Sequence, residues 1–165
     1  MSRVVRVLGV DPGMASTGLA VIDQESGRFR LIHYSVLRSS PREALTVRLQ
    51  RIHLGVRDVI EGHGVRNMAI ERVYVGKNVR SALTLGHARA ASILSAALEG
   101  VEVAEYTPTE VKRAVGAGGA GDKDQVWRMV RMLVSGLPEK IPVDASDAIA
   151  IAICHLNRYS VGRLH

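Results

Sequence analysis

Four acidic residues stand beside apolar segments, where a carboxylate could do chemistry. Asp11 follows the apolar run Val4–Val10, Glu71 follows the apolar letters MAI, and Asp144 and Asp147 precede the letters AIAIAIC. Residues three apart share a helix face, so the last two acids point the same way. Clustered carboxylates repel one another unless cations neutralise them. Because hard oxygen ligands suit Mg²⁺ or Mn²⁺, the pattern predicts a site for such ions.

Two such ions about 4 Å apart would activate a water molecule and stabilise the leaving oxygen of a phosphodiester. Each acid also has a plainer interpretation. The letters DPG after the first apolar run are good turn chemistry, which explains Asp11 without a ligand. Glu71 could simply end a strand. Asp144 could be a helix N-cap with Asp147 as its acidic partner at the third helical position.

The elements that must position these acids follow from the pattern of apolar residues. A nearly continuous apolar run indicates a buried strand, and turn signals after it favour an antiparallel meander. Apolar residues then recur at helical spacing until two glycines end the helix. The expected strands are Val4–Val10, Gly18–Asp23 and Phe29–Leu37, and the helix runs from Leu45 to Ile60.

The rest of the chain alternates strands with helices. Thr107, Pro108 and Glu110 form the sequence of a capping box, which predicts a helix start. We therefore predict an α/β fold with a mixed five-stranded sheet flanked by helices, in a single domain over residues 1–165. The remaining expected elements are strands Asn67–Glu71 and Val101–Tyr106, and helices Asn78–Glu99, Lys123–Ser135 and Asp144–Asn157.

Composition narrows the class of protein. The 165 residues carry a net charge of +6, which favours a polyanionic partner, nucleic acid first and an acidic membrane surface second. Cys154 is the only cysteine, so no internal disulfide forms, which fits the cytoplasm. The longest apolar stretch, residues 148–154, is too short to span a bilayer.

Four segments resemble the RuvC family of Holliday junction resolvases: GVDPGMASTG, AIERVYVGKNVRSALTLGHARA, EYTPTEVKRAVGAGGAGDKDQV and VDASDAIAIAICH. The resemblance implies a ribonuclease-H-like fold, a homodimer, and two-metal cleavage of four-way DNA junctions at symmetric positions in recombination and repair. It also implies cooperation with a branch-migration motor complex. By matching motif, Asp11, Glu71, Asp144 and Asp147 become the catalytic acids, with two Mg²⁺ ions per site and Mn²⁺ as a possible substitute.

The resemblance also suggests residues that contact DNA. Tyr74, where the family often has Phe, would stack on an unpaired base, although its ring could instead pack on the following helix. Lys112 and Lys123 flank a glycine-rich loop and match basic residues important in the family; the alternative is a solvated charge. Further candidates for phosphate contact are Arg72, Lys77, Arg80 and Arg113.

Several interpretations stay open. The letters ARAASILSAALEG make the second half of helix 78–99 apolar nearly all round, which fits either deep packing or a dimer interface. Trp127, His87 and His155 are expected to be structural.

Rival functions are a different nuclease or transposase-like enzyme, an ATPase of the actin and sugar-kinase type, and an inactive DNA-binding or scaffolding module. The ATPase would need two such domains, and the presence of all four acids favours activity.

Overall fold

The computed structural model describes residues 4–72 and 78–161, and their strands form one mixed sheet. Within these ranges the strand order is β5-β4-β1-β2-β3-β6. The first three strands form the expected antiparallel meander, whereas β4 and β5 add in parallel to β1, and β6 adds in parallel to β3. The strands are β1 Val5–Asp11, β2 Ser16–Glu25, β3 Arg28–Arg38, β4 Asn67–Glu71, β5 Glu102–Tyr106 and β6 Val134–Ser135.

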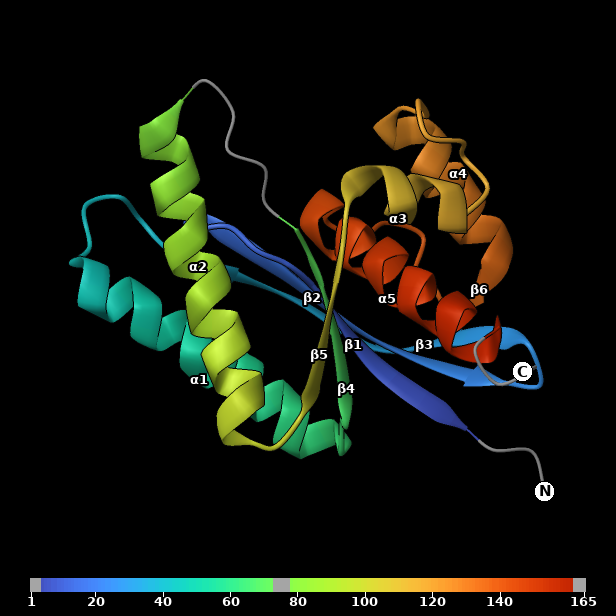
Figure 1. Ribbon diagram of the computed structural model, residues 1–165, viewed down its shortest axis with the longest axis horizontal. Coiled ribbons are helices and arrows are strands. Elements are labelled where there is room, and N and C mark those ends of the chain that lie inside the picture. Colours follow the sequence, from blue (N-terminus) through green and yellow to red (C-terminus); the bar gives the residue numbers. More distant parts are fainter. Residues whose placement is uncertain (1–3, 73–77, 162–165) are drawn as a thin grey trace.

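Helices cover both faces of the sheet (Figure 1). Two lie on one face, and the other three lie on the opposite face, with the last helix along the middle of the sheet. The helices are α1 Leu45–His63, α2 Val79–Leu98, α3 Pro108–Ala114, α4 Lys123–Leu133 and α5 Val143–Val161. Over the described ranges, none of these helices is both long and apolar enough to cross a membrane.

Alternation along the strands divides the core into two layers, because successive side chains point to opposite faces. Val7 of β1 and Ala69 of β4 belong to the layer under α5, and Leu8 and Met68 belong to the layer under α1 and α2. Both layers are fully buried at these positions. The acids that end β1 and β4 are therefore directed toward α5 by the same alternation.

Two glycines let α5 approach the sheet closely. A Cβ atom on Gly9 would lie 1.9 Å from the carbonyl oxygen of Ala148, and one on Gly18 would lie 2.0 Å from that of Asp144. No side chain fits at such distances, so only glycine allows the backbones to meet here. The first turns of α5 thus lie directly over β1 and β2.

The structure corrects two expectations and confirms another. Helix α4 ends at Leu133, and residues 134–135 form β6 instead of the helix end, so the sheet of the described residues has six strands and not five. The N-cap interpretation of Asp144 is wrong because α5 begins at Val143, one residue before it. The backbone N–H of Ser146 donates to the carbonyl oxygen of Pro142, so the first helical hydrogen bond already spans Asp144. The capping box of Thr107 and Glu110 is confirmed.

Candidate active site

Asp11 and Glu71 end neighbouring parallel strands on the same face of the sheet. Val10 of β1 pairs with Ile70 of β4. The residues that follow them, Asp11 and Glu71, therefore lie side by side. Both side chains are half-buried and point toward the α5 side, as Gly9 and Ala69 do two residues earlier. Two carboxylates that share an edge of the sheet repel one another.

The first turns of α5 bring the other two acids to this edge. The Ser16 hydroxyl, at the start of β2, donates a short hydrogen bond to Asp144 Oδ2. Lys123, at the start of α4, donates from Nζ to Asp147 Oδ2 at 3.1 Å. Three separate parts of the chain therefore supply the acids, and Ser16 and Lys123 orient two of them.

The electrostatics of the site favour added positive charge. Burial, together with the nearby charges of Asp147, Glu71 and Asp144, raises the pKa of Asp11 to about 8, against the opposing effect of Lys123. Burial also raises the pKa of Glu71 and of Asp147. A carboxyl group that resists ionisation beside other acids gains free energy from a nearby cation.

A pocket of about 360 Å³ opens where these groups meet. Its walls combine acids, lysines and apolar side chains, so it offers oxygen ligands beside positive charge. The lining residues are Asp11, Glu71, Pro108, Val111, Lys112, Lys123, Val126, Asp147, Ala150 and Ile151.

The carboxylate groups of the described residues are too far apart for three of them to bind one common metal ion. Across residues 4–72 and 78–161, no three His, Cys, Asp or Glu side chains are grouped tightly enough to hold one ion. Mutual repulsion and the bond from Lys123 to Asp147 are physical reasons for this spacing. The donor set itself fits a hard divalent cation, because it offers carboxylate oxygens and neither thiolate nor imidazole.

The residues expected to contact DNA are distributed unevenly around this pocket. Lys112 and Lys123 line it, whereas Arg80 and Arg113 are exposed on α2 and α3 outside the pocket lining. Arg72 is exposed and lies 3.6 Å from Glu105 in a surface ion pair. Tyr74 and Lys77 lie outside the described residues.

Two residues of the site were missed from the sequence. Ser16 orients Asp144, yet nothing in its local sequence distinguishes it from a turn serine. Arg89 of α2 donates from Nε to the carbonyl oxygen of Glu71 at 3.0 Å and pairs with Glu105 at 2.6 Å, so it supports the end of β4. An arginine among the small residues of GHARAAS was the available signal for Arg89.

The expected structural residues differ in their surroundings. Trp127 packs partly buried against the core, with Arg131 over its ring. His155 accepts or donates a hydrogen bond at 2.8 Å with the Tyr106 hydroxyl, and burial lowers its pKa. His87 instead lies exposed on α2, which does not support the structural role expected for it.

Comparison with known proteins identifies the family. The family model described as crossover junction endodeoxyribonuclease RuvC matches residues 7–155. The chain belongs to this family. It is 44% identical over 154 residues to the crossover junction endodeoxyribonuclease RuvC of Magnetococcus marinus, covering 93% of this chain and 85% of that one.

Solved structures agree with the family assignment. The structure of T. thermophilus RuvC in complex with Holliday junction substrate superposes with a TM-score of 0.89 at 31% identity, covering 96% of each chain. The yeast mitochondrial Holliday junction resolvase has a TM-score of 0.64 at 13% identity, covering 98% of this chain and 85% of that one, and shows a shared fold. The ribonuclease-H-like class expected from the sequence is thus confirmed.

Proposed function

We propose that this protein resolves four-way DNA junctions by symmetric paired nicks, using its four acids to bind divalent metal in recombination and repair. The observation that carries the proposal is the convergence of Asp11, Glu71, Asp144 and Asp147 from β1, β4 and α5 at one edge of the sheet. Membership of the RuvC family supports it, as does the related T. thermophilus protein in complex with Holliday junction substrate.

The acids would hold two Mg²⁺ ions, and Mn²⁺ offers the same ligand chemistry. When bound, such ions activate water and stabilise the leaving oxygen of a phosphodiester. Ser16 holds the Asp144 carboxylate in place. Lys123 supplies positive charge beside Asp147 at the pocket wall, where it would stabilise negative charge developing on the scissile phosphate.

The remaining DNA contacts extend from this pocket. Lys112 stands in the pocket wall, and Arg72, Arg80 and Arg113 are exposed and would bind phosphates outside it. Tyr74 would stack on an unpaired base and Lys77 would add a phosphate contact. A branch-migration motor complex is the expected partner, and the buried free thiol of Cys154 fits a cytoplasmic setting.

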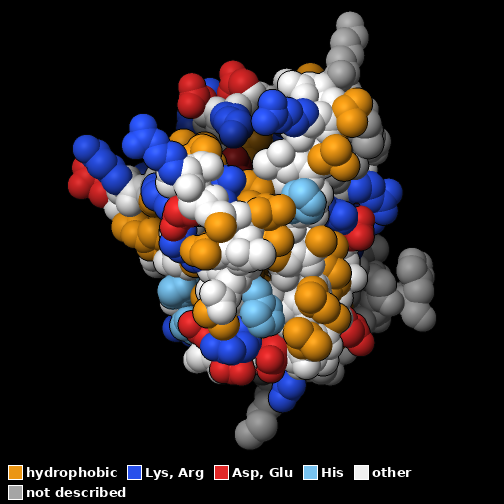
Figure 2. All heavy atoms as spheres, turned by 90° about the vertical axis from the view of Figure 1, so that its left-hand side faces the viewer, with side chains coloured by type: hydrophobic (Ala, Val, Ile, Leu, Met, Phe, Trp, Pro, Cys, Tyr) orange, Lys and Arg blue, Asp and Glu red, His pale blue; other side chains and the backbone are white. Residues whose placement is uncertain are grey.

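The outer face of α2 favours a homodimer. Val79, Leu83, Leu94 and Leu98 follow a helical spacing and are 56% to 65% exposed. Apolar side chains also gather on the molecular face formed by α1 and α2 in Figure 2. A two-fold dimer places two active sites on a substrate with pseudo-two-fold symmetry, so that both strands are cut.

Sedimentation tests the dimer. We expect a species of twice the 17.8 kDa chain mass at micromolar concentration. The double variant Leu83→Glu, Leu94→Glu should sediment as a monomer, because like charges would meet in the interface. A matched double variant at exposed Leu45 and Val47 of α1 should stay dimeric. A wild-type protein that is monomeric with and without junction DNA would contradict this part of the proposal.

Junction cleavage tests the activity. A mobile four-way junction, labelled on each strand, is incubated with the protein under Mg²⁺ or Mn²⁺ titration, and the cut sites are mapped. We expect paired nicks at symmetry-related positions, with no cutting of a linear duplex of the same sequence. Equal cutting of both DNAs would favour a different nuclease on the same fold. Absence of any cutting with either ion would favour an inactive binding module.

A further inference from the structure

A group of arginines lies on the connection between β3 and α1, outside the pocket already described. Arg38, Arg42, Arg48 and Arg51, here termed the arginine cluster, share residues 38–51 with a single acid, Glu43. The segment therefore has a net charge of +3, which is half of the charge of the whole chain. Such a concentration of guanidinium groups is typical of a surface that binds phosphates.

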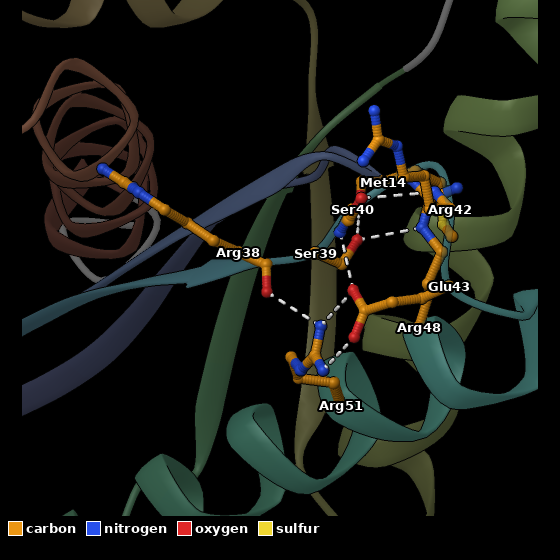
Figure 3. Close-up of polar contacts among 8 residues, drawn as sticks. All are labelled: Met14, Arg38, Ser39, Ser40, Arg42, Glu43, Arg48 and Arg51. Carbon is orange, nitrogen blue, oxygen red and sulfur yellow. Dashed lines mark hydrogen bonds and ion pairs between the residues drawn. The ribbon is translucent and has the colours of Figure 1, made fainter.

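Two of the four arginines hold the connection rigid. Arg51 pairs with Glu43 through two hydrogen bonds of 2.8 and 2.5 Å and also donates to the carbonyl oxygen of Arg38 at 3.0 Å. Arg48 donates from Nε to the Ser39 hydroxyl at 3.0 Å (Figure 3). Glu43, the only acid of the segment, is therefore already paired with Arg51. The same contacts fix the backbone that carries Arg38 and Arg42.

The connection between β3 and α1 is also hydrogen-bonded to the turn that follows Asp11. Ser39 donates from its hydroxyl to the carbonyl oxygen of Met14 in a short hydrogen bond, and its backbone N–H donates to the carbonyl oxygen of Ala15 at 3.0 Å. Met14 and Ala15 belong to the turn that follows Asp11. The arginine cluster therefore keeps a fixed position relative to the acids.

Arg38 and Arg42 are left with exposed side chains. Neither guanidinium lies within ion-pair distance of an acid in the part of the chain that the structure describes. Figure 3 shows the Arg38 side chain extending away from the other arginines, on the side of α5. A rigid backbone that presents unpaired guanidinium groups is preorganised to bind a phosphate group through two parallel hydrogen bonds to two of its oxygens.

Strand register places Arg38 beside the acids. Arg38 of β3 pairs with Ser16 of β2, and directly opposed residues of antiparallel strands share a face. Ser16 points toward α5, because its hydroxyl bonds to Asp144. Arg38 therefore emerges on the catalytic face, next to the Asp144 side of the site. Lys112 and Lys123 line the pocket from the α3 and α4 side.

From this geometry we infer that the arginine cluster, with Arg38 at its front, is a second phosphate-binding surface that holds the DNA backbone beside the acids. The inference rests on the proposed function and adds to it a specific contact surface. The DNA strand would pass between the lysines of α3 and α4 on one side and Arg38 and Arg42 on the other. Phosphate contacts of this kind raise affinity and fix register without reading sequence.

The salt dependence of junction binding tests the inference. Each phosphate contact releases counterions, so loss of one contact lowers the slope of log K against log salt by about 1. Fluorescence anisotropy measures the Kd of a fixed four-way junction, in chelator, over a series of KCl concentrations. We expect Arg38→Gln to raise the Kd by about 5- to 20-fold near 0.1 M salt and to lower the slope by about 1, with a smaller change for Arg42→Gln.

Arg28→Gln is the matched control. Arg28 is exposed at the opposite end of β3, and its substitution removes the same charge. We expect its Kd to stay within about twofold of the wild type with an unchanged slope. Arg38→Lys should recover most of the slope and only part of the affinity, because an ammonium group keeps the charge and loses the two-pronged geometry. Thermal melting of each variant checks that it is folded.

The outcomes separate the inference from the proposed function. A wild-type protein that binds and cuts junctions, with an Arg38→Gln variant of unchanged Kd and slope, would overturn the inference alone. Equal losses in Arg28→Gln and Arg38→Gln would also overturn it, since only the net charge would then count. A wild-type protein that neither binds nor cuts a junction would overturn both. A loss confined to Arg38→Gln and Arg42→Gln would support the inference.

Discussion

Asp11 and Asp23 are both acids on the first two strands, but the protein treats them differently. Asp23 lies at the other end of the β1–β2 pair, where Arg6 donates to both of its carboxylate oxygens at 2.7 Å. Arg6 also donates to the carbonyl oxygen of His63 at 2.8 Å, and Arg30 adds a longer contact to Asp23 at 3.7 Å. Asp11 instead faces three other acids, and among the described residues Lys123 is the charge that opposes them.

The difference lies in where the balancing charge comes from. The protein itself balances Asp23, which is 3% exposed and has two arginines against it. Within residues 4–72 and 78–161, no arginine pairs with Asp11, and Lys123 is already bonded to Asp147. A buried carboxylate with fixed arginine partners serves the fold. A carboxylate grouped with other acids depends on a cation from solution, which is the basis of the proposed metal site.

The largest expected difference between the two regions is in catalysis. Glu71→Gln should lower junction cleavage by about 10³-fold or more, because a bound metal ion contributes several kcal/mol of charge stabilisation. Asp23→Asn should stay within about threefold of the wild type at a temperature where it is folded, since its carboxylate lies at the far end of the strands. Single-turnover cleavage at saturating protein measures both. Similar losses in both variants would remove the distinction between the regions.

For stability the order of the two regions reverses: loss of the Asp23 charge should matter more than loss of a site acid, and the expected effect is smaller than the one on catalysis. Asp23→Asn should lower the free energy of unfolding by about 2–3 kcal/mol, because it leaves Arg6 without its charged partner, and part of that guanidinium can still reach water. Urea unfolding of the metal-free protein measures this change. The variant Asp23→Asn, Arg6→Met should recover part of the loss, since it removes the unpaired charge. A single variant as stable as the wild type would show that the pair is not structural.

The smallest effect, counted per pH unit, is the change of stability with pH. The pKa of Asp11 rises to about 8 on folding, so between about pH 4 and pH 8 the native state binds a proton that the unfolded chain releases. The stability of the metal-free protein should therefore fall as pH rises through this range, by at most about 1.4 kcal/mol per unit from this group.

Asp11→Asn is the matched variant for this pH effect. It should flatten the dependence and make the metal-free protein more stable than the wild type near pH 8, because it removes one charge from the group of acids. Thermal melting from pH 4.5 to 8.5 in chelator measures both proteins. A wild-type protein that becomes more stable over that range, in parallel with Asp11→Asn, would contradict the electrostatic account of the site.

Much of the fold was predictable because its signals are local. Alternating and continuous apolar runs located β1 to β5, and glycines and the capping box located helix ends. Strand β6 was not predictable, because two residues are too few to show a period and its pairing with Phe29 depends on the tertiary fold. The start of α5 was misplaced because Asp144 and Pro142 are both acceptable near a helix N-terminus.

The four acids of the candidate site were predicted from their positions at apolar boundaries, whereas their hydrogen-bond partners were not predicted. The contacts of Ser16 with Asp144 and of Arg6 with Asp23 join residues 128 and 17 positions apart. Such pairs follow from strand register and from the close approach of α5 at Gly18, neither of which a single sequence specifies. The position of Arg38 beside Ser16 was hidden for the same reason.

The most direct test of the metal-dependent site measures junction binding and junction cleavage on the same samples of wild type and Asp11→Asn. The account predicts that the wild type cuts a four-way junction at paired symmetric positions with Mg²⁺ and not with chelator. It predicts that Asp11→Asn binds the junction with a Kd within about threefold of the wild type and cuts it about 10³-fold more slowly or not at all. Cleavage by Asp11→Asn at the wild-type rate, or wild-type cleavage that persists in chelator, would contradict it.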